Sequence, residues 1–214
     1  MFKAENFQFQ VVPFHEVVGV GDIQWPESDV AVGISFHAAL NVKWTTQDSL
    51  RPFRPSDAED FLAWARDDKV THYLRWKTIT SREEALIYIQ QVAIPHPWRQ
   101  SICLDNHSIG YISVKPESSN DRHRAHVGYA IGSEYWGQGI VTAALKIAIP
   151  IVFEKFPFLV RLEALVEEDN VGSQKVLEKV GFVREGFLRK YGFNKGEIRD
   201  MFIYSFLKTD KIAS

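Results

Sequence analysis

The sequence of 214 residues has little of several features that would mark a specialised protein class. It has one cysteine, Cys103, so no disulfide can form within the chain, and a reducing compartment suits it. No apolar run approaches the length that spans a bilayer, and the first residues lack a signal-peptide pattern. The formal net charge of −2 gives no overall attraction to nucleic acid or anionic membranes. We therefore predict a cytoplasmic protein that binds neither nucleic acid nor membrane.

Other absent features exclude or disfavour particular kinds of functional site. Cys103 lies in an apolar stretch typical of a core strand, where a buried inert thiol is favoured over a nucleophile. His123 and His126, three apart in a predicted strand, would point to opposite faces, so we predict no metal site. No Gly-Lys-Ser/Thr sequence ends a nucleotide phosphate loop. Gly137-x-Gly139 is followed by Thr142 where a dinucleotide fingerprint needs a third glycine, which disfavours that fold.

The composition that is present suits an ordinary globular domain with a large core, because 45% of the residues are hydrophobic and 13% are aromatic. Residues 1–46 differ in composition from the rest of the chain, with few charges and several turn-forming residues. Phe7, Phe9 and Val11 alternate with polar residues, which suggests a strand. We predict an N-terminal extension over residues 1–46 and one domain over residues 47–210.

From residue 48 onward the pattern predicts alternating helices and strands. Ser56 and Asp57 supply N-cap chemistry for a helix through Ala65, and Ser81 with Glu84 forms a capping box for a second helix. Later helices are expected from about 140 to 156, with Pro150 kinking or dividing it, and from 171 to 180. Strands are expected over residues 49–53, 100–104, 108–114, 125–131, 160–166, 182–188 and 199–207, with tight turns at 105–107 and 194–196. This order predicts a mixed α/β fold with a central, mostly antiparallel sheet.

The stretch Trp136-Gly137-Gln138-Gly139 joins a strand to a helix. Glycine permits tight dihedral angles and close approach of a ligand, so backbone N–H groups can converge on one anion at a helix N-terminus. On its own, such a pair of glycines is equally compatible with an ordinary tight turn.

Two further motifs follow this turn in order. Together with Asn170-x-x-Ser173 and Leu177-x-x-x-Gly181-Phe182, it resembles the GNAT superfamily of N-acetyltransferases, in particular the Rim-type branch that acetylates ribosomal-protein N-termini. The resemblance covers roughly residues 50–207, and the sequence Leu50-Arg51-Pro52-Phe53 is most similar to that of plant members of this branch. It implies a twisted sheet splayed between its fourth and fifth core strands, with helices on both faces. It also implies acetyl transfer from acetyl-CoA to a primary amine by direct attack, the acceptor being a protein N-terminal α-amine or a small amine.

The resemblance also implies a set of residues for each ligand. The pyrophosphate would be held by backbone groups of the turn, and the pantetheine arm would pair with the preceding strand. Trp136 and Val141 depart from the superfamily pattern at the first and last positions of the turn. The implied acetyl-CoA residues are Tyr129, Ala130, Ile131, Trp136, Gly137, Gln138, Gly139, Ile140, Val141, Thr142, Asn170 and Ser173. Tyr73, Trp76 and Trp98 are candidates to line the acceptor pocket, although core packing is the commoner fate of such residues.

Catalytic residues are expected by the same resemblance. Many GNAT proteins protonate the departing thiolate with a tyrosine at the position of Leu177, whereas the Rim-type branch uses the serine that is Ser173 here. Ser173 could equally cap its helix. His126 is the candidate general base, because imidazole titrates near neutral pH, with Glu134 as the fallback. A purely structural histidine at the strand edge is an equally good interpretation.

A second functional hypothesis stays open on the sequence alone. His126 replaces a carboxylate that Rim-type proteins usually carry in this strand, and residues 1–46 are unusual. A catalytically silent module that binds acyl-CoA or regulates a partner would explain both features.

Overall fold

The computed structural model describes residues 49–213. The predicted extension over residues 1–46, with its strand around Phe7, Phe9 and Val11, lies outside the described residues. Within residues 49–213, no helix is both long enough and apolar enough to cross a membrane. The elements are β1 Ser49–Pro52, η1 Pro55–Asp57, α1 Ala58–Ala65, α2 Asp68–Thr71, α3 Arg82–Tyr88, η2 Ile89–Ala93, β2 Arg99–Leu104, β3 His107–Pro116, η3 Ser119–Asp121, β4 Arg124–Ile131, η4 Ser133–Tyr135, α4 Ile140–Lys155, β5 Arg161–Glu167, α5 Val171–Val180, β6 Val183–Asn194 and β7 Glu197–Leu207.

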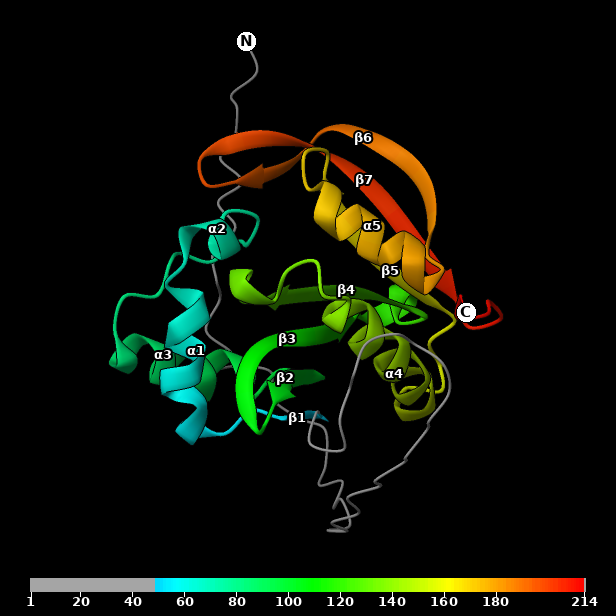
Figure 1. Cartoon of the computed structure of the whole chain (residues 1–214). Helices are drawn as coiled ribbons and strands as arrows, with labels where there is room; N and C mark the ends of the chain where they lie inside the picture. The colour runs from blue at the N-terminus through cyan, green and yellow to red at the C-terminus, as the bar shows by residue number, and fades with distance from the viewer. Residues whose placement is uncertain (1–48, 214) are drawn as a thin grey trace. The chain divides into compact units, whose positions relative to one another are not determined.

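The strands form one sheet of seven in the order β1-β2-β3-β4-β5-β7-β6 (Figure 1). Every neighbouring pair is antiparallel except β4 and β5, which run parallel. The β4–β5 ladder joins residues 124–126 to residues 161–163 and then stops, so the two strands separate over the rest of their length. The predicted sheet class and the splay between the fourth and fifth strands are therefore confirmed.

Each face of the sheet has its own hydrophobic core, because alternate strand residues point to opposite faces. Ile112 and Val114 of β3 belong to one core together with Leu145 of α4. Tyr111, which directly precedes Ile112, belongs to the other core together with Phe61 of α1. Helices α1 and α3 thus cover one face and α4 covers the other (Figure 1), as the sequence predicted.

Capping at the first helices follows the sequence in one case and departs from it in another. The Ser81 hydroxyl accepts the Glu84 N–H at 3.2 Å, and the Glu84 carboxylate reaches back to the Thr80 N–H at 2.8 Å. Asp57 was expected to cap α1, but its carboxylate makes no cap bond to that helix. It accepts the Arg54 N–H at 2.8 Å at the start of η1 and pairs with the Arg51 guanidinium at 2.7 Å, so it links β1 to the turn that precedes α1.

Helix α4 is continuous from Ile140 to Lys155, so of the two outcomes predicted for Pro150, a kink or a division, the division is wrong. Pro150 is exposed, and the helix keeps its packing on either side through buried Ile149 and Val152. Proline removes one backbone hydrogen bond, and on the solvent side water can satisfy the carbonyl that loses its partner. Burial of the opposite face therefore holds the helix together.

Ion pairs stabilise the end of the sheet where β4 and β5 still pair. Arg161 of β5 contacts Glu163 at 2.7 Å and donates to Glu185 of β6 at 2.9 Å, and Arg124 of β4 donates to Glu163 at 3.1 Å. The hydrogen bonds from Arg161 and Ser205 lower the pKa of Glu185 to about 2. This network closes one end of the β4–β5 gap, and the other end stays open.

Candidate active site

The glycine turn lies at the open end of the splay and starts α4. Gly137 and Gly139 have φ values of 74° and 78°, in the left-handed region that favours glycine, and Gly139 is the N-cap residue of α4. No side chain caps this helix, so the N–H groups of its first turn lack partners within the helix. A cavity of about 510 Å³ borders the turn. The turn therefore presents free backbone donors to a space large enough for a ligand.

This cavity, called the turn cavity below, is lined by every residue expected to contact acetyl-CoA except Gln138. The Gln138 side chain is exposed and its amide donates to the Glu134 carbonyl at 2.9 Å, which fixes the turn from outside. Val141 is 8% exposed and belongs to the core on the α4 side of the sheet. Its branched side chain is thus largely accommodated by the core.

Two lysines that sequence reasoning missed also line the turn cavity. Lys175 and Lys179 are four residues apart on α5 and so project from the same side of the helix. Their spacing behind Asn170 is a local signal that could have found them. Backbone N–H groups and two ammonium groups at one cavity form a suitable environment for phosphate.

Ser173 and Tyr129 form a hydroxyl pair beside this cavity. The Ser173 Oγ lies 2.7 Å from the Tyr129 hydroxyl, which also donates to the Ser173 carbonyl at 3.1 Å. Asn170 caps α5 by accepting the Ser173 N–H at 3.1 Å, so the Ser173 side chain is not the helix cap. Burial raises the pKa of Tyr129, which keeps its proton in place at neutral pH.

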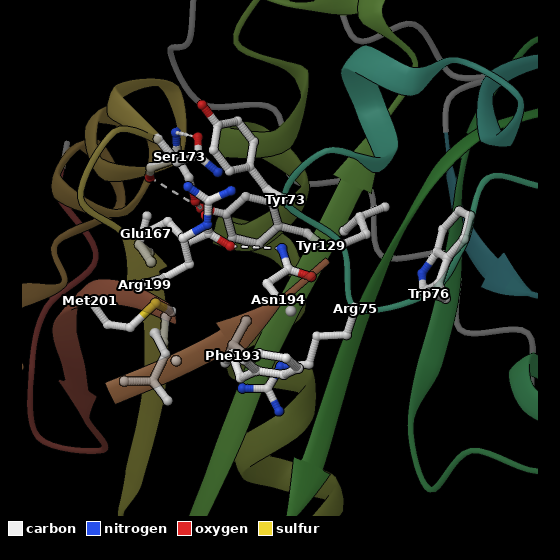
Figure 2. Close-up of a pocket in the computed structure, with 18 of the residues that line it drawn as sticks. Tyr73, Arg75, Trp76, Tyr129, Glu167, Ser173, Phe193, Asn194, Arg199 and Met201 are labelled. Atoms are coloured by element: carbon white, nitrogen blue, oxygen red, sulfur yellow. Dashed lines mark hydrogen bonds and ion pairs between the residues drawn. The ribbon is translucent and has the colours of Figure 1, made fainter. Parts of the chain in front are cut away.

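A second cavity, of about 330 Å³, adjoins the first and is called the acceptor cavity below. The two cavities share Tyr73, Leu74, Tyr129, Asn170 and Ser173 in their linings. Figure 2 shows the Tyr129 and Ser173 side chains meeting at one side of the acceptor cavity, away from Trp76. The hydroxyl pair therefore stands where the two spaces meet.

The acceptor cavity contains a buried carboxylate that sequence reasoning missed. Glu167, 6% exposed at the end of β5, accepts a hydrogen bond from the Asn194 amide at 2.8 Å through Oε1 (Figure 2). Its Oε2 lies 3.4 Å from Arg199 Nε, and among the described residues it has no hydrogen-bond partner. Glu167 thus keeps one buried carboxylate oxygen, beside Arg199, that accepts no hydrogen bond within the described residues.

The tip of the β6–β7 hairpin closes one side of this cavity by bonding to the segment that follows α2. The Asn194 amide donates to the His72 carbonyl at 3.2 Å, and the Lys195 ammonium donates to the Trp76 carbonyl at 2.9 Å. Figure 1 shows the hairpin arching toward α2 and the loop that follows it. Residues more than 100 positions apart are therefore in contact here, and no local sequence pattern predicts this contact.

The residues expected to line the acceptor pocket divide between site and core. Tyr73 lines both cavities and Trp76 lines the acceptor cavity. Trp98 is instead 5% exposed in the core on the α4 side of the sheet, a difference from the prediction. Trp98 immediately precedes Arg99, which does line the cavity, and successive residues of an extended chain point to opposite faces.

The structure does not bring either candidate base to a cavity. His126 lies at the closed end of the β4–β5 gap, where its Nε2 is 2.9 Å from Glu117 and its Nδ1 is 4.0 Å from Glu163. Glu134 is exposed in η4. Neither residue is part of the lining of the two cavities.

Comparison with known proteins identifies the family. The family model described as "Acetyltransferase (GNAT) domain" matches residues 49–183. This chain belongs to the GNAT acetyltransferases. It is 31% identical over 165 residues to the uncharacterized N-acetyltransferase YoaA of Bacillus subtilis, covering 74% of this chain and 92% of YoaA.

Solved structures agree with this assignment. The ribosomal-protein-S5-alanine acetyltransferase of Vibrio fischeri superposes with a TM-score of 0.65 at 26% identity, covering 83% of this chain and 98% of that one. Mycobacterium smegmatis RimJ in complex with CoA-disulfide superposes with a TM-score of 0.62 at 27% identity, covering 74% and 81%. The relatives thus include Rim-type enzymes, as the motifs predicted, and the chain is an acetyl-CoA-dependent acyltransferase.

The turn cavity of this GNAT enzyme suits acetyl-CoA. The free N–H groups at the start of α4 and the ammonium groups of Lys175 and Lys179 complement phosphate charge. Tyr129, Ala130 and Ile131 stand on the part of β4 that has left its partner β5, so one side of this strand is free for an extended ligand. These observations fit the chemistry of the co-substrate, which supplies an activated acetyl group as a thioester.

Proposed function

We propose that this GNAT enzyme acetylates a primary amine, either the α-amine of a polypeptide or a small amine, by direct attack. The amine nitrogen attacks the thioester carbonyl carbon, a C–N bond forms, and the C–S bond breaks. One proton leaves the nitrogen and one is taken up by the sulfur. The observation that carries this proposal is the Tyr129–Ser173 hydroxyl pair at the junction of the two cavities.

Ser173 would protonate the sulfur, with Tyr129 as the second member of a short relay. The 2.7 Å contact allows the tyrosine proton to follow the serine proton. A thiol titrates near 8.5, so the thiolate is already a fair leaving group and this protonation contributes modestly. Backbone N–H groups at β4, by resemblance to the family, would polarise the thioester carbonyl.

Glu167 would take the proton from the amine, because it is the buried carboxylate of the acceptor cavity and its Oε2, 3.4 Å from Arg199 Nε, accepts no hydrogen bond from the described residues. An α-amine titrates at about 7.7 to 8.0, so a modest base is sufficient. His126, the residue expected from sequence, stays a candidate that would have to act through water, since its ring contacts Glu117 outside the cavity.

The acceptor class is supported by cavity size and by relatives. A cavity of about 330 Å³ suits the first residues of a polypeptide or a compact amine. The Vibrio fischeri structure above is named as a ribosomal-protein-S5-alanine acetyltransferase. The family match begins at residue 49, which supports our boundary between an extension over residues 1–46 and a catalytic domain over residues 47–210.

The test is thiol release from acetyl-CoA with a panel of peptides and small amines. Release should require an amine and yield the acetylated product by mass. We expect Glu167→Gln to lower kcat by about 100-fold or more and Ser173→Ala by about tenfold, with unchanged acetyl-CoA binding by titration.

His126→Gln is the decisive comparison for the base. If Glu167 acts, His126→Gln changes kcat by no more than about twofold. The opposite ranking would assign the base to His126. Absence of amine-dependent release with every acceptor would contradict the proposed function.

A further inference from the structure

Arg99 occupies a fixed position in the acceptor cavity. Its guanidinium carbon lies 4.8 Å from the centre of the Tyr111 ring and 5.8 Å from that of Tyr88. Its Nη1 donates to the Tyr88 hydroxyl at 3.1 Å. Two aromatic rings and one hydrogen bond thus hold a half-buried guanidinium in place before any ligand arrives.

Unlike the other half-buried arginines of the domain, Arg99 has no carboxylate partner among the described residues. Arg51, Arg124, Arg161 and Arg199 all form ion pairs with acidic side chains. Arg99 forms none, and its Nε is buried without a hydrogen-bond partner in the described part of the chain. A partly desolvated cation without a counter-charge is costly, and a planar guanidinium fork matches a carboxylate.

The sheet register places Arg99 and Glu167 on opposite sides of the acceptor cavity. Arg99 pairs with Ser113, and Ser113 pairs with Gly128, so these three residues form one row across β2, β3 and β4. Gly128 contributes no side chain to this row and lines the cavity. With β3 and β4 between them, and with β4 and β5 separated beyond residue 126, β2 and β5 are at least about 14 Å apart at a strand spacing of about 4.8 Å. The cavity therefore has a positive group at one side and a negative group at the other.

We propose that the acceptor carries a carboxylate set apart from its amine, and that Arg99 binds this carboxylate while the amine lies near Glu167 and Ser173. The proposal deepens the proposed function and rests on it for the placement of the amine. An acidic side chain or the C-terminal carboxylate of a very short peptide supplies the same chemistry. In an extended peptide each residue spans about 3.3 to 3.6 Å, so two residues span about 7 Å. The Arg99 and Glu167 side chains both line the cavity and shorten the distance that such a ligand has to bridge between their strands.

Two matched acceptor pairs test the proposal and distinguish these sources. Ala-Asp-Ala-amide against Ala-Asn-Ala-amide varies a side-chain carboxylate, and Ala-Ala against Ala-Ala-amide varies a terminal one, with the same α-amine throughout. We expect kcat/KM for the acidic member of at least one pair to exceed that of its neutral partner by about 30-fold or more. In Arg99→Gln the ratio of kcat/KM between the acidic and the neutral member should fall to within about threefold.

Three further variants separate a specific site from a general effect. Arg99→Lys keeps the charge but not the fork, so it should keep part of the preference. Tyr88→Phe removes the hydroxyl that holds Arg99 and should reduce the preference without unfolding the protein. Arg122→Gln removes one exposed positive charge outside both cavities and should leave the preference unchanged. An equal loss in Arg122→Gln would mean that net charge alone is sensed, and would overturn the proposal.

Peptide titration into the CoA-loaded protein keeps this proposal distinguishable from the proposed function. Tighter binding of the acidic peptide that is lost in Arg99→Gln supports the carboxylate site even where no peptide is acetylated, a result that would contradict only the proposed function. Equal acetylation and equal binding of acidic and neutral peptides by the wild-type enzyme would overturn the carboxylate site and leave the proposed function intact.

Discussion

The two cavities of this GNAT enzyme are built in different ways. The turn cavity is made largely by two short segments, residues 129–142 and 169–179, and by backbone groups that they leave free. The acceptor cavity is made largely by side chains from β2 to β5, the hairpin β6–β7, the start of α5 and the loop after α2. Binding through backbone depends on where glycines and helix ends fall, which is local information. Binding through side chains depends on which distant segments meet.

The charges of the two cavities differ as well. Lysines and backbone N–H groups give the turn cavity a mainly positive lining, with Asp169 as its acidic member. The lining of the acceptor cavity contains the buried carboxylate of Glu167 and three arginines, Arg75, Arg99 and Arg199, of which Arg199 contacts Glu167. One space is therefore suited to a polyanion and the other to a ligand with groups of both signs.

The largest expected effect tests the backbone origin of the turn cavity. A β-branched residue at φ 74° is strained, and its side chain would project into the turn cavity. Gly137→Val should therefore weaken acetyl-CoA binding by about 100-fold. Gly196→Val, at φ 85° with equally open space around its Cβ, is the matched control at the β6–β7 turn. Titration with acetyl-CoA should show an unchanged dissociation constant for the control. Similar losses in both variants would mean that destabilisation, not the cradle, is responsible.

A smaller effect is expected at the junction of the cavities. Tyr129→Phe removes the second hydroxyl of the relay and should lower kcat by about tenfold, with little change in the KM for acetyl-CoA. Tyr204→Phe removes another buried tyrosine hydroxyl, one bonded to Glu178 outside the cavities, and should leave kcat unchanged. Steady-state kinetics at saturating co-substrate provide the measurement. Equal rates for wild type and Tyr129→Phe would exclude the tyrosine from proton transfer.

The acceptor cavity should respond separately when its hairpin closure is loosened. Asn194→Ala removes the bonds to His72 and to Glu167, so the acceptor KM should rise by about fivefold while the KM for acetyl-CoA stays constant. The lost hydrogen bond to a buried carboxylate should also cost about 1–3 kcal/mol in the free energy of unfolding. Kinetics and denaturant melts measure the two effects. A matching rise in both KM values would show that the cavities are not independent.

The smallest effect concerns the closed end of the splay, away from both cavities. The Arg161 pair lowers the pKa of Glu185 from 4.5 to about 2, so its stabilisation is complete above about 4.5 and is lost as the pH falls through about 2. Glu185→Gln should lower the Tm by about 1–3 °C at neutral pH, because exposed ion pairs contribute little, and this difference should shrink between pH 4.5 and 2. Glu154→Gln, an exposed carboxylate without an ion pair in the described chain, is the control. A Tm difference that does not vary with pH would contradict the assignment.

Most of the fold was predictable because its signals are local. The Asp105-Asn106 and Lys195-Gly196 turns take the positive φ values typical of tight hairpins, and the helix of α5 ends at Gly181 with φ 110°, all close to the predicted places. The short helix α2 was missed, since its four residues carry no periodic pattern. Pro150 does not divide α4, because burial of the opposite helix face outweighs the backbone hydrogen bond that proline removes.

The site was predictable in the same uneven way. The residues of the turn cavity followed from the glycine turn and the Asn170-x-x-Ser173 motif, with Gln138 as the exception. Glu167, Arg99 and Asn194 of the acceptor cavity carry no motif that marks them, and Trp98, a candidate for the pocket lining, packs in the core instead. The sequence alone does not show which of two adjacent residues, Trp98 or Arg99, has its side chain in the cavity.

The sequence by itself determined the family, the order of helices and strands, and the backbone cradle, because each depends on residue spacing within one segment. Only the tertiary structure decided which side chains face the acceptor. Strand pairing places Arg99 and Gly128 in one row on either side of Ser113, and the hairpin tip brings Asn194 to Glu167 across more than twenty residues. Such contacts arise from long-range packing, which no single stretch of chain encodes.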